Sequence, residues 1–452
     1  MSQPTSSAPR DFGHPPHVLA FWRRLVCDAL RTGTPTPFYL FSAEPIQAAL
    51  EELRAFEPLP VPVRHWLSCK TQPLAPLLRW WRAQGRPIEV VSEFEFLAAR
   101  HEGFATNDIL INGPAKHRWL PRVALPGLRV NFDSPRELKT LLPLAKRLRW
   151  RIGLRLRTSL EHDPEHPEFP TQFGCEPAEA LAALRTLRRA GLVAETLHFH
   201  LRTNVASADI YERALREAHA FCVAADWWPA FLDCGGGLPP RHTFGHDGRE
   251  FAAQFKSSAV GADVRRLHSK SARGTRHAKS KQRLLPSSSA VLEALADAFR
   301  RWTPRFTGLR ELWLENGRFV SARSGVLVVT VLDVKERAGL RQLICDGGRT
   351  MNALVSNWEE HGLFSVPQRS GAPAPTAVHG PTCMAFDQLT RRPLPRSLRP
   401  GDTLVWLEAG AYHLPWETRF SHGQAVVLWH EGTTLKVVRK AEPFGTWWKP
   451  WR

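Results

Sequence analysis

The stretch LSCKTQP at residues 67–73 ends an apolar run with Lys70 and leads, from Pro73, into a segment with helical spacing. A strand that turns sharply into a helix is the repeating unit of α/β folds. A lysine amine, with an ordinary pKa of roughly 10.4, is a poor nucleophile at neutral pH unless burial or a neighbouring group lowers that pKa. Lys70 is therefore a candidate for forming a Schiff base if other functional side chains gather around it.

The same strand-then-helix pattern recurs along the chain. Ser134 opens one helix with a capping box, in which Glu137 follows three residues later and Pro135 occupies the first helical position. The apolar runs that alternate with helical segments lie at 63–69, 88–92, 108–112, 128–132, 149–156, 196–201, 229–234 and 310–315. Eight such units over roughly 260 residues predict an α/β fold, a (β/α)8 TIM barrel.

The active site of such a barrel lies at the carboxyl ends of its strands. Those ends carry Lys70, Glu89, Ser92, Asn112, Arg155, His200, Gly235, Gly236, Gly237, Glu315, Gly317 and Arg318. Three consecutive glycines let backbone N–H groups approach a phosphate, although many such runs are only turns. Arg318 can donate a planar pair of N–H groups to phosphate oxygens, whereas an isolated arginine is more often a surface residue. We expect the nearby His198 to point to the other face of its strand and to be structural.

These motifs resemble those of the fold-type III pyridoxal-phosphate decarboxylases, the family of diaminopimelate, ornithine and arginine decarboxylases, whose barrel is alanine racemase-like. The resemblance runs from about residue 35 to about residue 423 and begins with TPFYL at 36–40. The sequence FHLRT at 199–203 is similar to the family's Phe-His-x-Gly-Ser, and ENGR at 315–318 is similar to its Glu-Pro-Gly-Arg. GPTC at 380–383 and GAY at 410–412 resemble two further family motifs.

The resemblance implies a role for each matching residue. Lys70 would bond to pyridoxal 5′-phosphate, His200 would lie against its ring, and Glu315 would pair with the ring nitrogen. The residues that would bind the cofactor phosphate are Gly235, Gly236, Gly237, Arg318 and Tyr412. Cys383 would be a catalytic acid, although most cysteines without such a context are buried structural residues. The loop of Cys383 reaches into the neighbouring subunit in the family, which implies a homodimer with shared active sites.

Two departures from the family pattern concern the substrate. Decarboxylases of diamino substrates place an acidic residue after the loop cysteine, whereas this chain has Met384 and so lacks a carboxylate for a distal ammonium. Arg202 replaces the family's glycine, and it either receives a substrate carboxylate or stacks as part of the structure. We therefore expect a small-molecule amino-acid substrate that is not a diamino acid, bound in part by Arg202 and Met384.

The resemblance predicts a pyridoxal-phosphate-dependent amino-acid decarboxylase, which is a carboxy-lyase. Glu315 would keep the cofactor ring protonated and so favours decarboxylation over racemisation or epimerisation, because the racemase branch typically places an arginine there. Two alternatives stay open. One is a pyridoxal-phosphate-dependent racemase or epimerase, and the other is a cofactor-binding regulatory relative without turnover.

The length of 452 residues exceeds one ordinary core, which suits a barrel with a second domain. We expect the barrel at 45–325, and a mainly β domain built from 1–44 and 326–452, where runs such as VLVVTV at 326–331 have strand character. The seven cysteines include no C-x-x-C pair, which argues against a disulfide framework and a zinc site, and we expect no metal.

The net charge of +18 has a local origin. Residues 256–283 contain nine Lys or Arg and one Asp, which gives about +8, within an apparent disordered insertion at about 241–287. This segment lacks interleaved aromatic residues, so we expect no nucleic-acid partner. No apolar run is long enough to span a membrane and no signal peptide opens the chain, so we expect a cytoplasmic protein without a membrane partner. The sequence does not decide whether the tail WWKPW at 447–451 docks on the body or on a partner.

Overall fold

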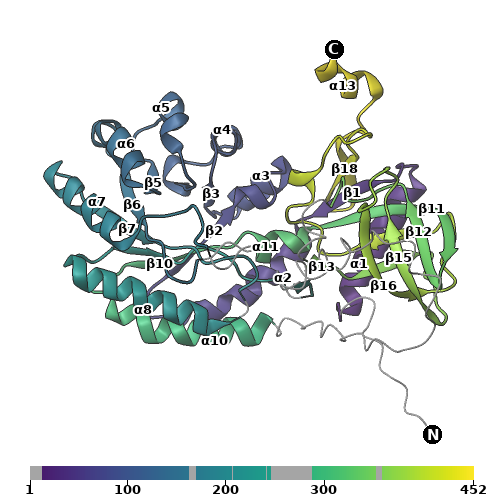
Figure 1. Cartoon of the computed structure of the whole chain (residues 1–452), viewed down its shortest axis with the longest axis horizontal. Coiled ribbons are helices and arrows are strands. Elements are labelled where there is room, and N and C mark those ends of the chain that lie inside the picture. The colour runs from purple at the N-terminus through teal and green to yellow at the C-terminus, as the bar shows by residue number, and fades with distance from the viewer. Residues whose placement is uncertain (1–12, 162–168, 206, 241, 246–287, 353–358) are drawn as a thin grey trace, which may run out of the picture.

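Parallel strands close into a barrel in the part of the chain that this computed structural model describes, namely residues 13–161, 169–205, 207–240, 242–245, 288–352 and 359–452 (Figure 1). The strands are β2 (Val63–Ser68), β3 (Ile88–Val90), β4 (Ile109–Ile111), β5 (Arg129–Phe132), β6 (Arg151–Arg155), β7 (Ala194–His198), β8 (Phe231–Asp233) and β10 (Glu311–Glu315). The barrel closes because β10 pairs in parallel with both β2 and β8. All eight apolar runs therefore form strands, and the predicted barrel is confirmed.

Helices surround this barrel on its outside (Figure 1). They are α2 (Glu44–Leu53), α3 (Ala75–Ala83), α4 (Glu93–His101), α5 (Leu120–Val123), α6 (Pro135–Arg147), α7 (Pro177–Arg189), α8 (Ala208–Ala225) and α10 (Ser288–Trp302). The Oγ of Ser134 accepts the N–H of Glu137 at 3.2 Å, as the predicted cap requires. The returning half of the box differs, because the Glu137 carboxylate accepts the N–H of Asp133 at 2.9 Å instead of that of Ser134. One half of the predicted capping box is thus present.

A layer of aromatic side chains fills the barrel beneath its carboxyl end. The ring of Trp313 lies 5.1 Å from that of Trp66 and 4.8 Å from that of Phe231. The guanidinium of Arg129 covers this stack, at 5.2 Å from the ring of Trp313. Trp66, Phe231 and Trp313 each precede the last residue of their strand by two positions, so those last residues form the next layer up on the same inward face.

A second, mainly β region lies beside the barrel (Figure 1). Its sheet contains β1 (Phe38–Ser42), β11 (Gly325–Arg337), β12 (Leu340–Cys345), β14 (Leu363–Val366), β15 (Pro373–His379), β16 (Gln388–Pro395), β17 (Thr403–Trp406), β18 (Val426–Glu431) and β19 (Thr434–Arg439). Strand β1 precedes the barrel in sequence, yet it pairs with β11 and β18. Helix α1 (Pro16–Arg31) packs its buried Trp22 and Val26 on this sheet. The predicted mainly β second region is confirmed.

The basic segment predicted as an insertion at about 241–287 lies almost entirely outside the described residues. Its described part contains β9 (Phe244–Gly245), which pairs with β13 (Glu359–Glu360). This small two-stranded sheet connects the chain after β8 with a segment of the second region.

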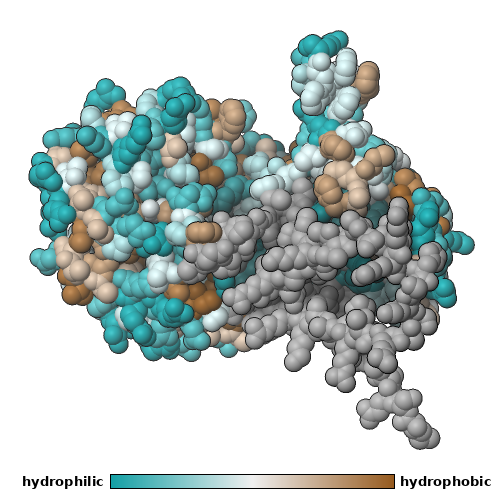
Figure 2. Space-filling view, viewed as in Figure 1, coloured by the Kyte–Doolittle hydropathy of each residue, from teal (hydrophilic) through white to brown (hydrophobic). Residues whose placement is uncertain are grey.

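The chain ends in an arm that stands clear of the body, at the top of Figures 1 and 2. It contains α13 (Phe444–Trp448), where the rings of Phe444 and Trp448 stack 6.2 Å apart. Trp451, just beyond this helix, has 62% of its surface exposed. Among the described helices, none combines the length and the apolar character needed to cross a membrane.

Candidate active site

Lys70 lies in a single turn of 3-10 helix, Cys69–Thr71, directly after β2. The Oγ of Ser321 donates a hydrogen bond to the Oγ1 of Thr71 at 2.9 Å. A Cβ on Gly317 would lie 2.4 Å from the Cγ2 of Thr71, so only glycine permits this approach. The turn is thus fixed against the segment that follows β10, and the Lys70 side chain, 37% exposed, emerges at the barrel rim.

The segment 410–412 of the second region lies against the same turn. The N–H of Tyr412 donates to the carbonyl oxygen of Thr71, and the Nε2 of Gln72 donates to that of Gly410, both at 2.8 Å. A Cβ on Gly410 would lie 1.9 Å from the carbonyl oxygen of Ser321, so this position also requires glycine. Two motifs that the sequence separates by more than 300 positions therefore meet at the rim.

Glu89 is the acidic residue next to Lys70. Its carboxylate is fully buried, and its Oε2 lies 3.9 Å from the Nζ of Lys70. Within the described chain, neither oxygen of Glu89 has a hydrogen-bond partner. Burial lowers the pKa of Lys70, but Glu89, Tyr412 and Glu315 together raise it further, so the net shift is upward. The lysine is therefore an ammonium that the negative charge of Glu89 stabilises.

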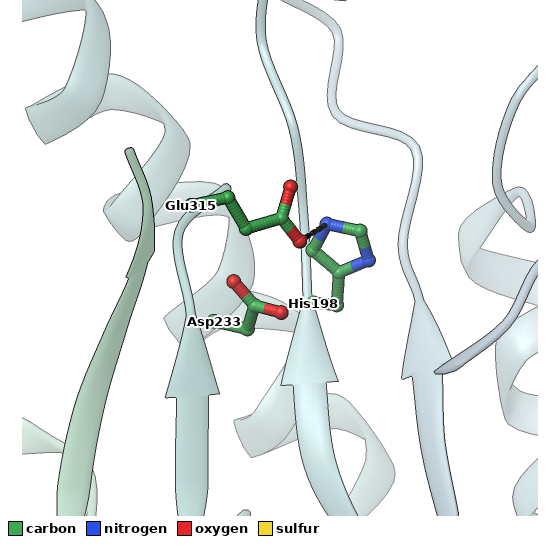
Figure 3. Close-up of side chains that lie close together, drawn as sticks. All are labelled: His198, Asp233 and Glu315. Carbon is green, nitrogen blue, oxygen red and sulfur yellow. Dashed lines mark ion pairs between the residues drawn. The ribbon is translucent and has the colours of Figure 1, made fainter. Parts of the chain in front are cut away.

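Glu315 ends β10 and points into the barrel (Figure 3). Its Oε1 lies 3.4 Å from the Nε2 of His198 and accepts a hydrogen bond from the Nδ2 of Asn112. Burial raises the pKa of Glu315, and the nearby carboxylates of Asp233 and Glu89 raise it further. A group with these properties readily shares a proton with a basic nitrogen placed against it.

Asp233 is the second acid of this cluster. The ligand atoms of Asp233, His198 and Glu315 all lie within 4.8 Å of one another, and the three side chains converge in Figure 3. The carboxylate of Asp233 accepts the N–H of Gly235 and the Nδ2 of Asn131, both at 3.1 Å. Burial raises its pKa to about 7, with a contribution from Glu89.

His198 corrects an expectation from the sequence. We expected its side chain on the opposite face of the strand from His200, but both imidazoles face Glu315, at 3.4 Å for His198 and 3.8 Å for His200. The physical reason is that residues two apart in a strand share a face. Burial and the charge of Arg155 lower the pKa of both imidazoles, which keeps them neutral.

The glycine turn closes over His200. The Nδ1 of His200 accepts the N–H of Gly236 at 3.1 Å. A Cβ on Gly236 would lie 2.2 Å from the carbonyl oxygen of Glu315, and a Cβ on Gly237 would lie 2.3 Å from that of Arg202. The turn therefore needs glycine for close packing against two neighbouring strand ends.

Arg318 begins the short helix α11 (Arg318–Ser321) after β10. Its Nε donates to the Oγ1 of Thr203 at 3.1 Å, and its guanidinium lies 4.5 Å from the centre of the Tyr412 ring. Its Nη1 forms an ion pair with the Oε1 of Glu359 at 2.7 Å. The structure thus brings together Arg318, Tyr412 and the residue after Arg202, and it adds an acid that sequence reasoning did not single out.

Two arginines of the rim, Arg155 and Arg202, differ in their burial and in their hydrogen-bond and ion-pair partners. Arg155 is buried and paired with Asp133 at 3.7 Å and with Glu161, so it serves the structure. Arg202 is exposed, and its side chain forms no hydrogen bond or ion pair with the part of the chain that is described. Arg202 consequently has unused donors at this rim.

The loop of Cys383 is held together by hydrogen bonds between its own residues. The carboxylate of Asp387 accepts the N–H of Thr382 at 3.0 Å and its hydroxyl at 2.6 Å. Cys383 is exposed, and Met384 donates its N–H to the Oγ1 of Thr382 at 3.4 Å. In the described chain no hydrogen bond or ion pair joins Cys383 or Met384 to Lys70.

The positions of several functional residues in the sequence already pointed to the site. Glu89 and Asn112 were noted only as strand ends, and Asp233 directly precedes the glycine turn. Their importance lies in their convergence, because they belong to β3, the end of β4 and β8 and still face one interior. Glu359 had no signal in its own surroundings, since its partner Arg318 is distant in the sequence.

The comparisons with known proteins agree with this geometry. The model of the pyridoxal binding domain of pyridoxal-dependent decarboxylases matches residues 47–263. A diaminopimelate decarboxylase of Deinococcus radiodurans is 26% identical, over 91% of this chain and 95% of its own length. An L-glutamyl-(BtrI acyl-carrier protein) decarboxylase of Niallia circulans is 25% identical, over 85% of this chain and 86% of its own length.

A solved structure supports the fold. Diaminopimelate decarboxylase from Helicobacter pylori, in complex with L-lysine, superposes with a TM-score of 0.70 and 20% identity, and the match covers 94% of this chain and 98% of that chain. At this level of identity the likeness concerns the fold alone.

The buried acids predict a pH dependence of stability. The folded protein holds the proton of Asp233 up to a pKa of about 7, whereas the unfolded chain releases it near roughly 3.9. The free energy of unfolding should therefore fall as the pH rises from about 4 to about 7. Asp233→Asn should weaken this fall, as measured by urea unfolding of the ligand-free protein at several pH values. Asp297→Asn, at an exposed ion pair, serves as the control. Equal pH slopes for the parent and Asp233→Asn would contradict the assignment.

Proposed function

Because the chain belongs to the fold-type III pyridoxal-phosphate decarboxylase family, we propose that it removes a carboxylate from an amino acid bound at the rim of its barrel. Its cofactor is pyridoxal phosphate. The observation that carries the proposal is the placement of Lys70 between Glu89 and the segment of Tyr412. Glu315 and Arg318 lie at the end of β10, the strand that pairs with the strand before Lys70.

The residues at the rim fit this cofactor. Gly236 and Gly237 pack so closely against the carbonyl oxygens of Glu315 and Arg202 that a Cβ at either position would clash with them. The buried carboxylate of Glu89, whose oxygens lack hydrogen-bond partners among described residues, lies beside the amine of Lys70. Pyridoxal phosphate supplies an electron sink for the electron pair left when carbon dioxide departs. The protein's task is then to orient the cofactor and to control protons.

The charges of the rim suggest how it does so. Glu315 would share a proton with the ring nitrogen of the cofactor in a charge-assisted hydrogen bond. The carboxylate of Glu89, 3.9 Å from the Nζ of Lys70, would hold the lysine amine in position beside the cofactor. With the cofactor bound, the neutral His200 would lie against its ring, and Arg318, Tyr412 and the glycines Gly235, Gly236 and Gly237 would surround its phosphate. These charges favour decarboxylation, because a protonated ring draws electrons most strongly.

The first prediction concerns Lys70. Borohydride reduction of the protein with bound pyridoxal phosphate should fix the cofactor to Lys70, because this lysine lies at the centre of the rim. Peptide mapping of the reduced protein would locate the label. Lys70→Ala should lose it, and Lys139→Ala, an exposed lysine of α6, should keep it. A label on another lysine would refute the assignment.

The substrate we propose is an amino acid with an acidic or apolar side chain. Met384 offers no carboxylate to a distal ammonium, and Arg202 presents unused donors at the rim. The relatives named above include enzymes of both kinds, since one is a diaminopimelate decarboxylase and another acts on an L-glutamyl group. The free cation at Arg202 favours the second kind for this chain.

The substrate prediction uses both positions. Arg202→Ala should raise the KM for an acidic amino acid about tenfold, by loss of one charge-assisted hydrogen bond, and leave the KM for a neutral one nearly unchanged. Arg202→Lys should retain part of the preference. Met384→Glu should improve the use of diamino acids. A panel of amino acids, assayed for carbon dioxide release and for stereo-inversion, gives the comparison. A parent enzyme with its highest kcat/KM for lysine, ornithine or meso-diaminopimelate would disprove the preference.

We also propose a homodimer with shared active sites. Among the described residues no hydrogen bond or ion pair joins the exposed Cys383 to Lys70, and Asp387 holds the loop in a defined shape. A loop that is ordered and exposed is suited to enter the site of a second copy, where Cys383 would donate a proton.

The assembly prediction is a complementation test. Inactive Lys70→Ala and Cys383→Ala chains, mixed under conditions that exchange subunits, should regain part of the parent activity, because one of the two sites in each mixed dimer is intact. Either variant alone, treated identically, is the control. Exchange without any recovery would argue that each chain completes its own site.

A further inference from the structure

Arg318, the arginine proposed to bind phosphate, already has an anionic partner. Its Nη1 lies 2.7 Å from the Oε1 of Glu359, and the side chains of Arg318 and Glu359 are 10% and 1% exposed. Water therefore does little to screen this ion pair. A phosphate that binds Arg318 meets a neighbouring negative charge.

Glu359 is held in place from several sides. The Nδ2 of Asn204 donates to its Oε1 at 2.7 Å, and the Nε2 of His361 lies 3.5 Å from its Oε2. Burial raises the pKa of Glu359, but Arg318, His361 and Asn204 lower it further, to about 2. The carboxylate is consequently charged at any pH at which the protein works.

The chain around Glu359 belongs to the same cradle. Strand β13 pairs with β9, which follows the glycine turn after β8, and Asn204 directly follows Thr203, the residue that Arg318 contacts through its Nε. Glu359 therefore approaches Arg318 from a segment outside the barrel and ends among the loops that would surround a phosphate. None of the sequence motifs includes it.

We propose that Glu359 is a specificity-determining residue, an internal anion that competes with the cofactor phosphate for Arg318 and weakens the binding of phosphate-bearing ligands at this site. The inference rests on the proposed function, because it takes Arg318 as the phosphate ligand. Its physical basis is the repulsion between two anions that share one cation in a poorly hydrated site. Such a site releases its cofactor more readily than one in which Arg318 has no acidic partner.

The test compares ligands with and without a phosphate. Glu359→Gln removes the charge but keeps an oxygen that accepts from Arg318 and Asn204. It should tighten the binding of pyridoxal phosphate and of inorganic phosphate about tenfold, and leave the binding of pyridoxal unchanged. Absorbance titration measures the two aldehydes, and calorimetry measures inorganic phosphate.

Matched variants identify the cause. Glu359→Asp keeps the charge and should stay near the parent affinity. Glu417→Gln removes the charge of another acid that pairs with an arginine and is also 1% exposed, and it should have no effect on any of the ligands. If Glu359→Gln does not fold, Asn204→Asp, which adds a charge beside Glu359, should weaken the binding of pyridoxal phosphate and leave that of pyridoxal unchanged.

Each other outcome overturns the inference. Unchanged or weaker binding of pyridoxal phosphate by Glu359→Gln would mean that the carboxylate only orients Arg318, and an equal gain for pyridoxal would mean a general loosening of the site. The proposed function and the inference about Glu359 can be refuted by different results. Absence of any cofactor bond to Lys70 in the parent protein refutes the proposed function, whereas a normal bond with no effect of Glu359→Gln refutes only this inference.

Discussion

A carboxylate buried at the carboxyl end of the barrel, Glu315, sets the conditions for the rest of the site. An isolated buried carboxylate is costly, so its surroundings must either neutralise it or pair it. Asn112, His198 and Asp233 come from other strands to do this, and they reach Glu315 only because β10 closes the barrel between β2 and β8. The aromatic layer beneath them keeps water out from below, which strengthens every charge interaction at the rim.

The turn of Lys70 is the point where the barrel and the second region are joined. Hydrogen bonds from Ser321 and from the segment of Tyr412 reach the turn from two directions, and glycine at 317 and at 410 allows the backbones to approach. The strand ladder that places this segment runs from β17 through β11 to β1. The sheet thus contributes directly to the position of the lysine. A change in the packing of the sheet would therefore shift Lys70 at the rim.

Charge is separated across the rim in a way that gives a ligand one orientation. The carboxylates of Glu89, Asp233 and Glu315 gather inside the barrel, whereas Arg318 contacts Tyr412 and Thr203. A ligand with a basic nitrogen at one end and an anion at the other fits this polarity in one direction only. The ion pair of Arg318 with Glu359 adds a negative charge to the cationic side and moderates its attraction for anions.

The sequence by itself determined the barrel, the strand ends and the motif residues, because hydrophobic period, capping residues and short motifs are local properties of the chain. The eight apolar runs became β2 to β8 and β10, and Lys70, His200, Glu315 and Arg318 lie at one rim. Only the tertiary structure decided that Asp233 joins Glu315 and that Glu359 pairs with Arg318. These relations depend on barrel closure and on the pairing of β9 with β13, which bring together residues far apart in the chain. No local sequence pattern encodes a contact between residues that are far apart in the chain. These contacts and their effects on charge are therefore visible only in the folded chain.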